Sequence, residues 1–247
     1  MKEFPEQDGG EASVVWERPE PVTRPAPSPL SRERIIAAAI GIADREGLAS
    51  VSLRRVAGAL NAGPMRLYGY LSTKEELLDL MVDDVYGEMA ATAPDAGDWR
   101  EAPRWVARAI RRVAKSHQWF IDLLAGRPQF GPKALAFRET AFGALNGAPG
   151  FEDIDLAMQA MRTVMAYVIG AMWSETTELR AEQSSGMDQT AWQAASWPYI
   201  RRMIATGRFP MLEKITREAS HPPADVVFAQ GLEWVLDGIA TRLPRSG

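Results

Sequence analysis

Apolar residues recur at helical spacing along almost the whole chain, and this periodicity limits the possible fold more than any other feature. From residue 31 onward, apolar side chains return every three or four positions, and Gly and Pro residues mark the breaks between these stretches. The sequence shows no strand-like alternation of apolar and polar residues, no internal repeat and no heptad run. It therefore predicts an all-α fold.

Three short helices and the start of a fourth are expected between residues 31 and 76. Ser31 and Ser52 are suitable N-caps for the first two helices, and Gly47 is a suitable C-terminal stop for the first. Asn61 tolerates the left-handed conformation of a tight turn before a third helix near 64–70. Two overlapping capping boxes then open the fourth helix; they pair Ser72 with Glu75 and Thr73 with Glu76.

The rest of the chain keeps the helical pattern. Further helices are expected near 99–118, 131–146, 152–182, 187–206, 209–219 and 223–243. Pro198 should kink or split the helix near 187–206, because proline lacks the amide hydrogen that a helix interior needs.

The formal net charge of −4 conceals an uneven distribution of charge. Residues 1–20 contain two basic and six acidic residues, whereas residues 21–74 contain eight basic and three acidic ones. A basic block beside an acidic remainder is typical of a DNA-binding module, although many solvated helices are also locally basic.

Composition argues against several other classes of protein. The chain has no cysteine, which excludes disulfides, thiolate zinc sites and thiol nucleophiles. Its two histidines, His117 and His221, are far apart, and the sequence has neither a glycine-rich phosphate loop nor a nucleophile elbow. It also shows no export signal and no apolar run long enough to cross a bilayer. We therefore expect a cytoplasmic protein that is not an enzyme, has no metal or cofactor and does not bind membranes.

Segment 31–76 has the pattern of a helix-turn-helix unit. A helix fits the major groove of DNA and reaches base edges there, while a partner helix braces it against the phosphate backbone. The same pattern also suits a small helical core whose surface is basic by chance, and the pattern alone does not choose between the two interpretations.

A family resemblance favours the DNA-binding interpretation. The stretch SLRRVAGALNAGPMRLYGYLSTKEELL, residues 52–78, closely resembles the DNA-binding domain of TetR-family transcriptional regulators. The Leu67-Tyr68 pair, Lys74 and the Leu77-Leu78 pair all fall at the spacing of that family.

The resemblance extends over roughly residues 30–243. Residues 98–102, residues 123–128 and the Gly131-Pro132 pair resemble the all-α ligand-binding domain of the tetracycline-repressor branch. Val15-Trp16 and residues 19–21 look similar to the simocyclinone efflux-pump repressor branch. The implied organisation is an arm at 1–30, a helix-turn-helix domain at 31–76, and a ligand-binding and dimerisation domain at 77–247.

The resemblance also suggests which residues contact DNA. Arg54 matches a position that reaches a base edge, and Arg66 lies on the recognition helix, where it is suited to bidentate pairing with guanine. Positions that contact phosphate in the family are matched by Tyr68, Tyr70 and Lys74. Thr73 and Lys74 also lie at a helix N-terminus, which favours a phosphate.

Two residues depart from the family pattern. Asn61 replaces the usual turn glycine, which the turn should tolerate. Gly69 stands where a bulky side chain is common, so a contact is expected to be missing, and this helix should be weakened by up to about 1 kcal/mol.

The proline-rich arm, residues 1–30, should be extended or disordered. Its Arg18 and Arg24 are candidates for insertion into a minor groove near the main site. The alternative is an acidic tail without a role in DNA binding, because residues 1–20 carry net negative charge.

Seven of the eight tryptophans and a helical stripe of methionines lie beyond residue 98. Such stripes usually form the core, but they also suit a pocket for a large polycyclic ligand. With the family resemblance, they predict a pocket among the helices near 99–118, 131–146 and 152–182. The expected lining residues are Trp105, Trp119, Phe137, Met161, Met165 and Trp173.

The resemblance further implies a homodimer joined through the helices near 152–182 and 223–243. The apolar face of the last helix is formed by Phe228, Leu232, Val235, Leu236 and Ile239, which could instead pack inside its own subunit. A two-fold dimer presents its recognition helices about one DNA turn apart, so the operator should be nearly palindromic.

The expected function is that of a repressor of an efflux or resistance gene, released from double-stranded DNA by a small hydrophobic polycyclic effector. The alternatives are a regulator that senses a diffusible signal or acyl ligand, an activator, and a ligand-binding protein without a DNA role.

Overall fold

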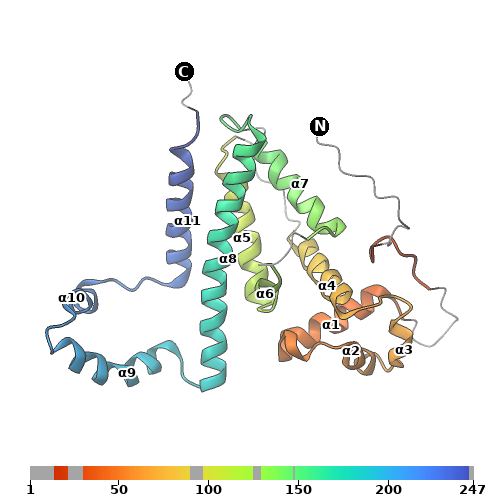
Figure 1. The fold of residues 1–247 in the computed structure, drawn as a ribbon, viewed down its shortest axis with the longest axis horizontal. Helices are drawn as coiled ribbons and strands as arrows, with labels where there is room; N and C mark the ends of the chain where they lie inside the picture. Colours follow the sequence, from red (N-terminus) through yellow and green to blue (C-terminus); the bar gives the residue numbers. More distant parts are fainter. Residues whose placement is uncertain (1–13, 22–29, 90–96, 125–128, 147, 245–247) are drawn as a thin grey trace. The chain divides into compact units, whose positions relative to one another are not determined.

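The computed structural model describes residues 14–21, 30–89, 97–124, 129–146 and 148–244. Within these ranges the regular elements are eleven α-helices and one short 3₁₀ helix, in the order shown in Figure 1. The predicted all-α class is therefore confirmed.

The chain forms two compact units. The first comprises Met1–Ala91 with Gly126–Glu139, and the second comprises Thr92–Ala125 with Thr140–Gly247. The sequence-based division assigned everything from residue 77 to the larger domain. In the structure α4 (Lys74–Glu88) belongs to the first unit, because its apolar face packs against α1 (Arg32–Glu46).

The first unit has the expected three short helices before α4. They are α1, then α2 (Leu53–Ala59) and α3 (Pro64–Leu67), with the 3₁₀ helix η1 (Leu48–Ser50) between α1 and α2. The hydroxyl groups of Ser31 and Ser52 each accept a backbone N–H at 3.3 Å, from Arg34 and Arg55, and so cap α1 and α2 as predicted. Asn61, with φ of 51°, adopts the left-handed conformation expected of the turn.

One of the two predicted capping boxes forms at the start of α4. The Thr73 hydroxyl accepts the Glu76 N–H at 3.2 Å. The Glu76 carboxylate accepts the N–H of Ser72 at 2.6 Å, one residue earlier than in the standard box.

The start of α7 (Pro132–Asn146) is capped by a carboxylate from α4. Asp83, only 5% exposed, accepts the N–H groups of Lys133 and Ala134 at 3.0 and 2.9 Å. Burial raises the pKa of Asp83, and the two backbone hydrogen bonds oppose that rise. Gly131 lies so close to Asp83 that a Cβ at position 131 would overlap the carboxylate.

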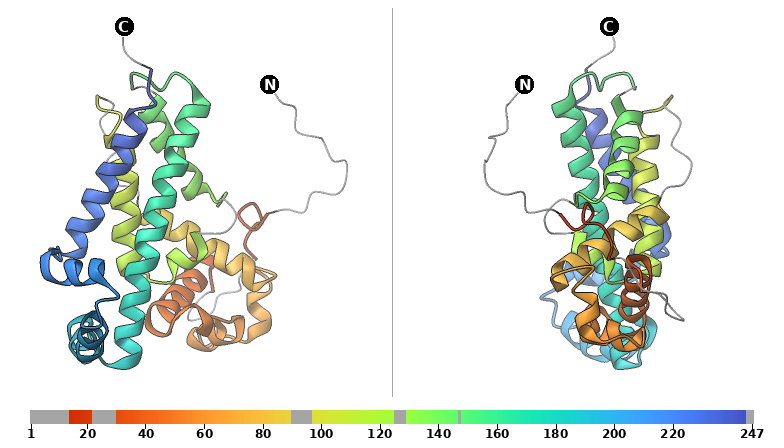
Figure 2. Two further views of the ribbon diagram at one scale, coloured as in Figure 1. Left: turned by 60° about the vertical axis from the view of Figure 1, so that its left-hand side comes forward. Right: turned by 90° about the vertical axis from the view of Figure 1, so that its right-hand side faces the viewer.

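The second unit is built around a long helix, α8 (Ile154–Ser185). It contacts α5 (Glu101–Ser116), α6 (Phe120–Leu124) and α11 (Ala224–Ala240), and Figure 2 shows α5, α8 and α11 running alongside one another. Most of the apolar face predicted on α11 is buried within this subunit, at Phe228, Leu232, Leu236 and Ile239. Of the two interpretations offered for that face, packing inside the subunit is the one found for these four side chains.

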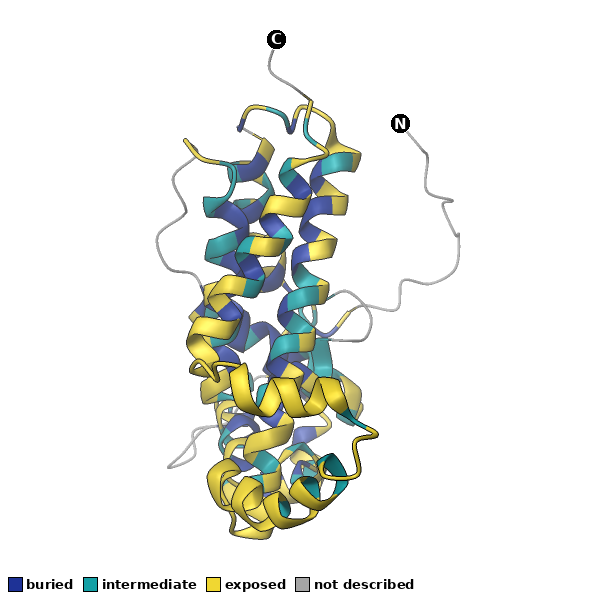
Figure 3. Cartoon of the chain, turned by 90° about the vertical axis from the view of Figure 1, so that its left-hand side faces the viewer, coloured by how far each residue is buried: buried dark blue, intermediate teal, exposed yellow. Residues whose placement is uncertain are grey.

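Two helices of the second unit, α9 (Gln189–Ile204) and α10 (Pro210–Glu218), have no buried residue. Their ribbons are exposed almost throughout (Figure 3). Pro198 lies inside α9, yet this helix is not split. Because the helix is exposed, water can reach the carbonyl of residue 194, which the proline leaves without an amide donor.

None of the helices in the described ranges has both the length and the apolar character needed to span a membrane.

Candidate nucleic-acid interface

The short helix α3 presents an exposed face on the first unit. Pro64 is its first residue, where the missing amide hydrogen costs nothing, and Leu67 is fully buried and holds α3 against the core. The neighbouring side chains therefore face solvent: Met65 is 79% exposed, Tyr68 is 51% exposed, and Arg66 is also exposed.

Two arginines on this surface are available for contacts with a partner. Arg54, at the second position of α2, and Arg66 on α3 are both exposed, and neither forms an ion pair with a described residue. Arg55, next in the chain after Arg54, instead forms a salt bridge with Glu46 of α1. Arg54 and Arg66 thus keep their guanidinium groups free for base edges, the targets for which such groups are suited.

The N-terminus of α4 lies in the same unit, with Thr73 exposed and Lys74 partly exposed. Unbonded backbone N–H groups in the first turn of a helix attract phosphate. Glu75 and Glu76 in that turn oppose an anion, but Glu76 is neutralised by a salt bridge with Arg18. Lys74 supplies a positive charge at this end of the helix.

Tyr70 belongs to the core rather than to the exposed surface. It is only 4% exposed, and its hydroxyl donates a hydrogen bond of 2.6 Å to the carbonyl of Leu30. Burial raises the pKa of this hydroxyl. We therefore correct the expected phosphate contact of Tyr70, because its only donor is already used inside the protein.

Part of the N-terminal arm is docked against the first unit. Residues 14–17 form a turn, and Val15 is 3% exposed. Arg18 pairs with Glu76 and donates to the Ser72 hydroxyl at 2.9 Å, while the Arg18 carbonyl accepts a hydrogen bond from Arg32. For this segment the expectation of an extended arm is corrected, and Arg18 is held by protein groups. Arg24 lies outside the described residues.

The arm accounts for the unusual glycine after Tyr68. A Cβ at Gly69 would lie 3.1 Å from the Cγ atom of Pro21, which is closer than a comfortable carbon–carbon contact. The missing side chain thus makes room for the arm. Sequence reasoning identified the departure at Gly69 but could not connect it to a residue 48 positions earlier.

Sequence reasoning also missed Met65. This side chain is the most exposed apolar group on α3 and lies directly before Arg66. An exposed apolar group at this position suits contact with a thymine methyl group. Its position in the first turn of the recognition helix is the sequence feature that could have identified Met65 as a contact residue.

The residues expected to line a ligand pocket do not form one cluster. Phe137 belongs to the first unit, where its ring lies 5.6 Å from that of Tyr86. Trp173 is 58% exposed on α8. Trp119 and Met161 are buried in the second unit, and Trp105 and Met165 are partly exposed there. Phe137 and Trp173 are therefore corrected as lining residues, because one packs with α4 and the other faces solvent.

Comparison with known proteins gives concordant matches. A family described as the tetracyclin repressor-like C-terminal domain matches residues 91–243. The HTH-type transcriptional repressor DrrR1 of Streptomyces coeruleorubidus is 33% identical over 228 residues, which cover 92% of this chain and 83% of the relative. An HTH-type transcriptional regulator of Saccharopolyspora erythraea is 36% identical over 167 residues, covering 68% of this chain and 70% of the relative.

A solved structure agrees with these sequence matches. The Streptomyces coelicolor TetR family protein ActR, in complex with actinorhodin, aligns with a TM-score of 0.74 and 27% identity. The alignment covers 89% of this chain and 100% of ActR. The matched relatives are transcriptional regulators and not enzymes.

Proposed function

This chain belongs to the TetR family of helix-turn-helix transcriptional regulators, and on that premise we propose that it represses an efflux or resistance gene and is released from DNA by a hydrophobic polycyclic small molecule. The observation that carries the proposal is the exposed face of α2 and α3, where Arg54, Arg66 and Tyr68 are free of partners inside the core. Cations and a hydroxyl-bearing ring on a helix that protrudes from a small helical unit suit the major groove.

Each DNA contact in the proposal has a separate task. Arg66 reads a guanine through two hydrogen bonds, and Arg54 reaches a base edge from the start of α2. The Tyr68 hydroxyl, Thr73 and Lys74 contact phosphates and set the position of α3 on the duplex. Tyr70 and Arg18 are left out because the protein itself occupies their polar groups.

The proposed active form is a homodimer joined through α8 and α11. Trp173 on α8 and Val227 on α11 are exposed by 58% and 50%. A homodimer interface would remove such large apolar side chains from water. Two copies of α3 related by a two-fold axis then read a nearly palindromic operator.

The polycyclic effector is supported by one neighbour, since ActR has been crystallised with actinorhodin. The second unit offers flat and flexible apolar side chains, Trp105, Trp119, Met161 and Met165, which suit such a molecule. An acyl or diffusible signal ligand would fit the same fold. Release of bound DNA by a panel of polycyclic and acyl compounds separates the two effector classes.

Binding of the purified protein to the DNA upstream of its own gene tests the proposal. Fluorescence anisotropy at two salt concentrations should show tight binding that weakens as salt rises, because phosphate contacts displace counterions. Arg66→Ala should reduce specific affinity by about 1–3 kcal/mol, the value of one bidentate base contact. The control variant is Arg45→Ala, which removes an exposed arginine in the last turn of α1 and should leave specific affinity unchanged.

The proposal would be rejected if wild type bound no fragment of a genome-derived library more tightly than random DNA, and if Arg66→Ala bound the fragments as tightly as wild type. The chain would then be a ligand-binding protein without a DNA role.

A minor-groove contact by Arg24 is a separate part of the proposal. Arg24→Ala tests it better than deletion of the arm, because deletion would also remove Val15 and Arg18, which pack against the first unit. We expect weaker binding to operators with an A·T-rich flank and no change in the free energy of unfolding.

A further inference from the structure

A groove of about 720 Å³ lies between α5 and α11 in the second unit. Its volume is within the range of sites for small organic molecules. The lining residues are Arg104, Arg108, Arg111, Arg112, Lys115, Asp225, Phe228, Ala229, Gln230, Leu232, Glu233, Trp234 and Asp237. None of the residues that sequence reasoning assigned to a ligand pocket is among them.

The α5 wall of this groove is a stripe of positive charge. It consists of Arg104, Arg108, Arg111, Arg112 and Lys115. At 3.6 residues per turn, these positions fall within an arc of about 100° and extend over about 16 Å of helix. Carboxylates on the facing helix, α11, can pair with this stripe.

The α11 wall carries carboxylates at four-residue spacing with one gap. Asp225, Glu233 and Asp237 belong to this series, and the intervening position is Ala229. Residues four apart share one face of a helix. The negative series is therefore interrupted at its second position.

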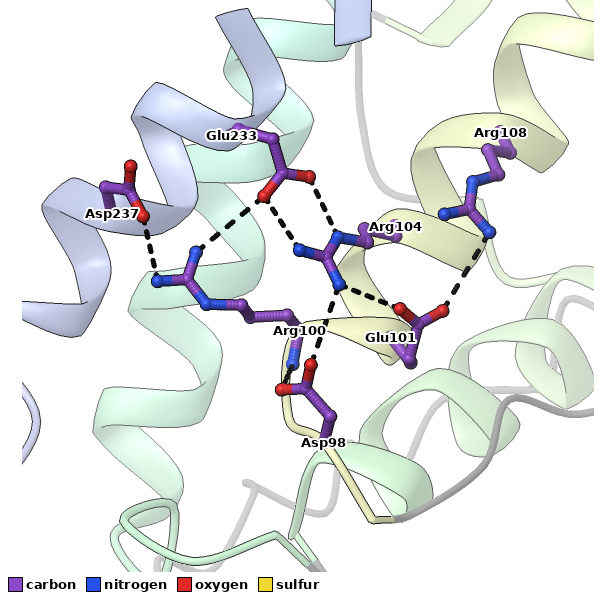
Figure 4. Close-up of polar contacts among 7 residues, drawn as sticks. All are labelled: Asp98, Arg100, Glu101, Arg104, Arg108, Glu233 and Asp237. Atoms are coloured by element: carbon purple, nitrogen blue, oxygen red, sulfur yellow. Dashed lines mark hydrogen bonds and ion pairs between the residues drawn. The ribbon is translucent and has the colours of Figure 1, made fainter. Parts of the chain in front are cut away.

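The carboxylates on both sides of the gap already form ion pairs with cations of α5 or of the residue before it. Asp225 accepts hydrogen bonds from Arg111 at 2.7 Å and Lys115 at 2.8 Å, and these bonds lower its pKa. Glu233 binds Arg104 through two bonds of 2.8 and 2.7 Å. Figure 4 shows this second cluster, in which Arg100 also reaches Asp237 at 2.8 Å.

Arg108 lies between these two clusters along α5. Its side chain is 65% exposed, and its ion pair is with Glu101 of its own helix, at a long 3.8 Å (Figure 4). No carboxylate among the described residues of α11 pairs with it. The break in the acidic series at Ala229 therefore coincides with a cation that has no ion pair with a described residue of α11.

Apolar side chains line the same groove as Arg108. Phe228 and Leu232 line the groove, and the Arg111 guanidinium lies 4.5 Å from the centre of the Phe228 ring. Trp234, 75% exposed, also borders the groove. A ligand with one anionic group and an aromatic or aliphatic body would match both features.

We propose that the α5–α11 groove is a binding site for a small amphipathic organic anion, whose acid group pairs with Arg108 beside Ala229 and whose apolar body lies on Phe228, Leu232 and Trp234. The site uses no residue of the proposed DNA interface. Its occupation can be measured without DNA, so the proposal stands apart from the proposed function.

Two dyes that share a ring system test the site. Anilinonaphthalene sulfonate carries the required anion, and N-phenylnaphthylamine is its neutral counterpart. Titration followed by dye fluorescence should show saturable binding of the sulfonate to the full-length protein. Arg108→Gln should weaken sulfonate binding about tenfold, as expected for loss of one charge-assisted hydrogen bond, and leave binding of the neutral dye unchanged.

A second pair of variants tests the gap from the opposite wall. Ala229→Glu continues the acidic series and should neutralise Arg108, so that sulfonate binding is lost. Ala229→Gln adds a side chain of the same length without charge and should retain most of the affinity. Circular dichroism melting curves check that all the variants fold.

The proposal is overturned if wild type, Arg108→Gln and Ala229→Glu bind the sulfonate with equal affinity, because the dye then occupies another apolar surface. It is equally overturned if wild type shows no saturable binding of the sulfonate, or if Ala229→Gln and Ala229→Glu lose affinity alike.

Discussion

Tyr68 and Tyr70 are two residues apart, yet their surroundings give the same side chain different roles. Tyr68 is 51% exposed on α3, whereas Tyr70 is buried and donates to the Leu30 carbonyl. A buried hydrogen bond of this kind contributes about 1 kcal/mol to stability. The hydroxyl of Tyr68 has no such bond to a described residue and is available for phosphate.

Removing each hydroxyl should therefore affect a different property. Tyr70→Phe should lower the free energy of unfolding by about 1 kcal/mol in urea titrations and leave operator affinity unchanged. Tyr68→Phe should weaken operator binding without changing stability. If Tyr70→Phe kept normal stability but bound DNA more weakly, the Tyr70 hydroxyl would have to contact DNA, contrary to its assignment to the core.

At the scale of elements, α4 and α7 are joined by one buried carboxylate. Asp83 of α4 accepts two N–H groups at the start of α7, and only a residue without a side chain fits beside it at position 131. These groups fix the position of the first turn of α7 on α4. The contact is specific because both the acceptor and the space are required.

Gly131→Ala should therefore destabilise the protein by about 1–3 kcal/mol, the usual cost of overpacking a core. Gly143→Ala, within α7, is the control, because a Cβ there meets nothing within 4 Å and alanine favours helices. Urea unfolding of both variants measures the difference. Equal stability of the two variants would mean that Asp83 can move away at little cost.

The stability contributed by the ion pairs between α5 and α11 should depend on pH. Hydrogen bonds from Arg104 lower the pKa of Glu233, with Arg100 and Arg108 adding to the effect. A carboxylate with a lowered pKa stabilises the fold above its ordinary pKa, and this contribution is lost as the pH falls through the lowered value. Melting temperature should thus fall as the pH decreases from about 5 to about 3.

Glu233→Gln should flatten this part of the pH profile and lower the melting temperature near neutral pH. Glu178→Gln, at an exposed site of α8 without an ion pair to a described residue, should leave the profile unchanged. A profile for Glu233→Gln that matches wild type would show that the ion pair does not contribute to stability.

The features predicted correctly from sequence depend on residues close together in the chain. The Ser31 and Ser52 caps, the left-handed Asn61 and the Thr73–Glu76 box need only neighbours within one turn. Their geometry follows from local chemistry, and so it could be predicted.

The features missed depend on contacts between distant residues. The Arg104–Glu233 pair spans 129 positions, and Asp83 meets α7 across 50. Helical periodicity shows which faces are apolar but not which helix covers each face. For that reason Phe137 was assigned to the wrong unit and Tyr70 to the surface, and the charged faces of α5 and α11 gave no sign that they lie opposite each other.

For the whole molecule, recognition of a palindrome requires two copies of α3 held by one interface. The face of α11 that sequence analysis assigned to that interface is mostly buried within the subunit, so the proposed dimer would use the outward faces of α8 and α11. Trp173 is the largest exposed apolar side chain on α8. Placing a charge there would bury it without a partner when two copies meet.

Trp173→Glu should therefore raise the dimer dissociation constant by about a hundredfold or more, since an unpaired buried charge costs about 3–5 kcal/mol. Analytical ultracentrifugation measures this change directly. Leu135→Glu alters an exposed apolar residue on α7 and should leave the protein dimeric. Affinity for a full palindrome should fall in Trp173→Glu while affinity for a single half-site stays the same, because each head keeps its own contacts. A Trp173→Glu protein that remains dimeric would place the interface at other exposed apolar residues, such as Trp192 and Trp197 on α9.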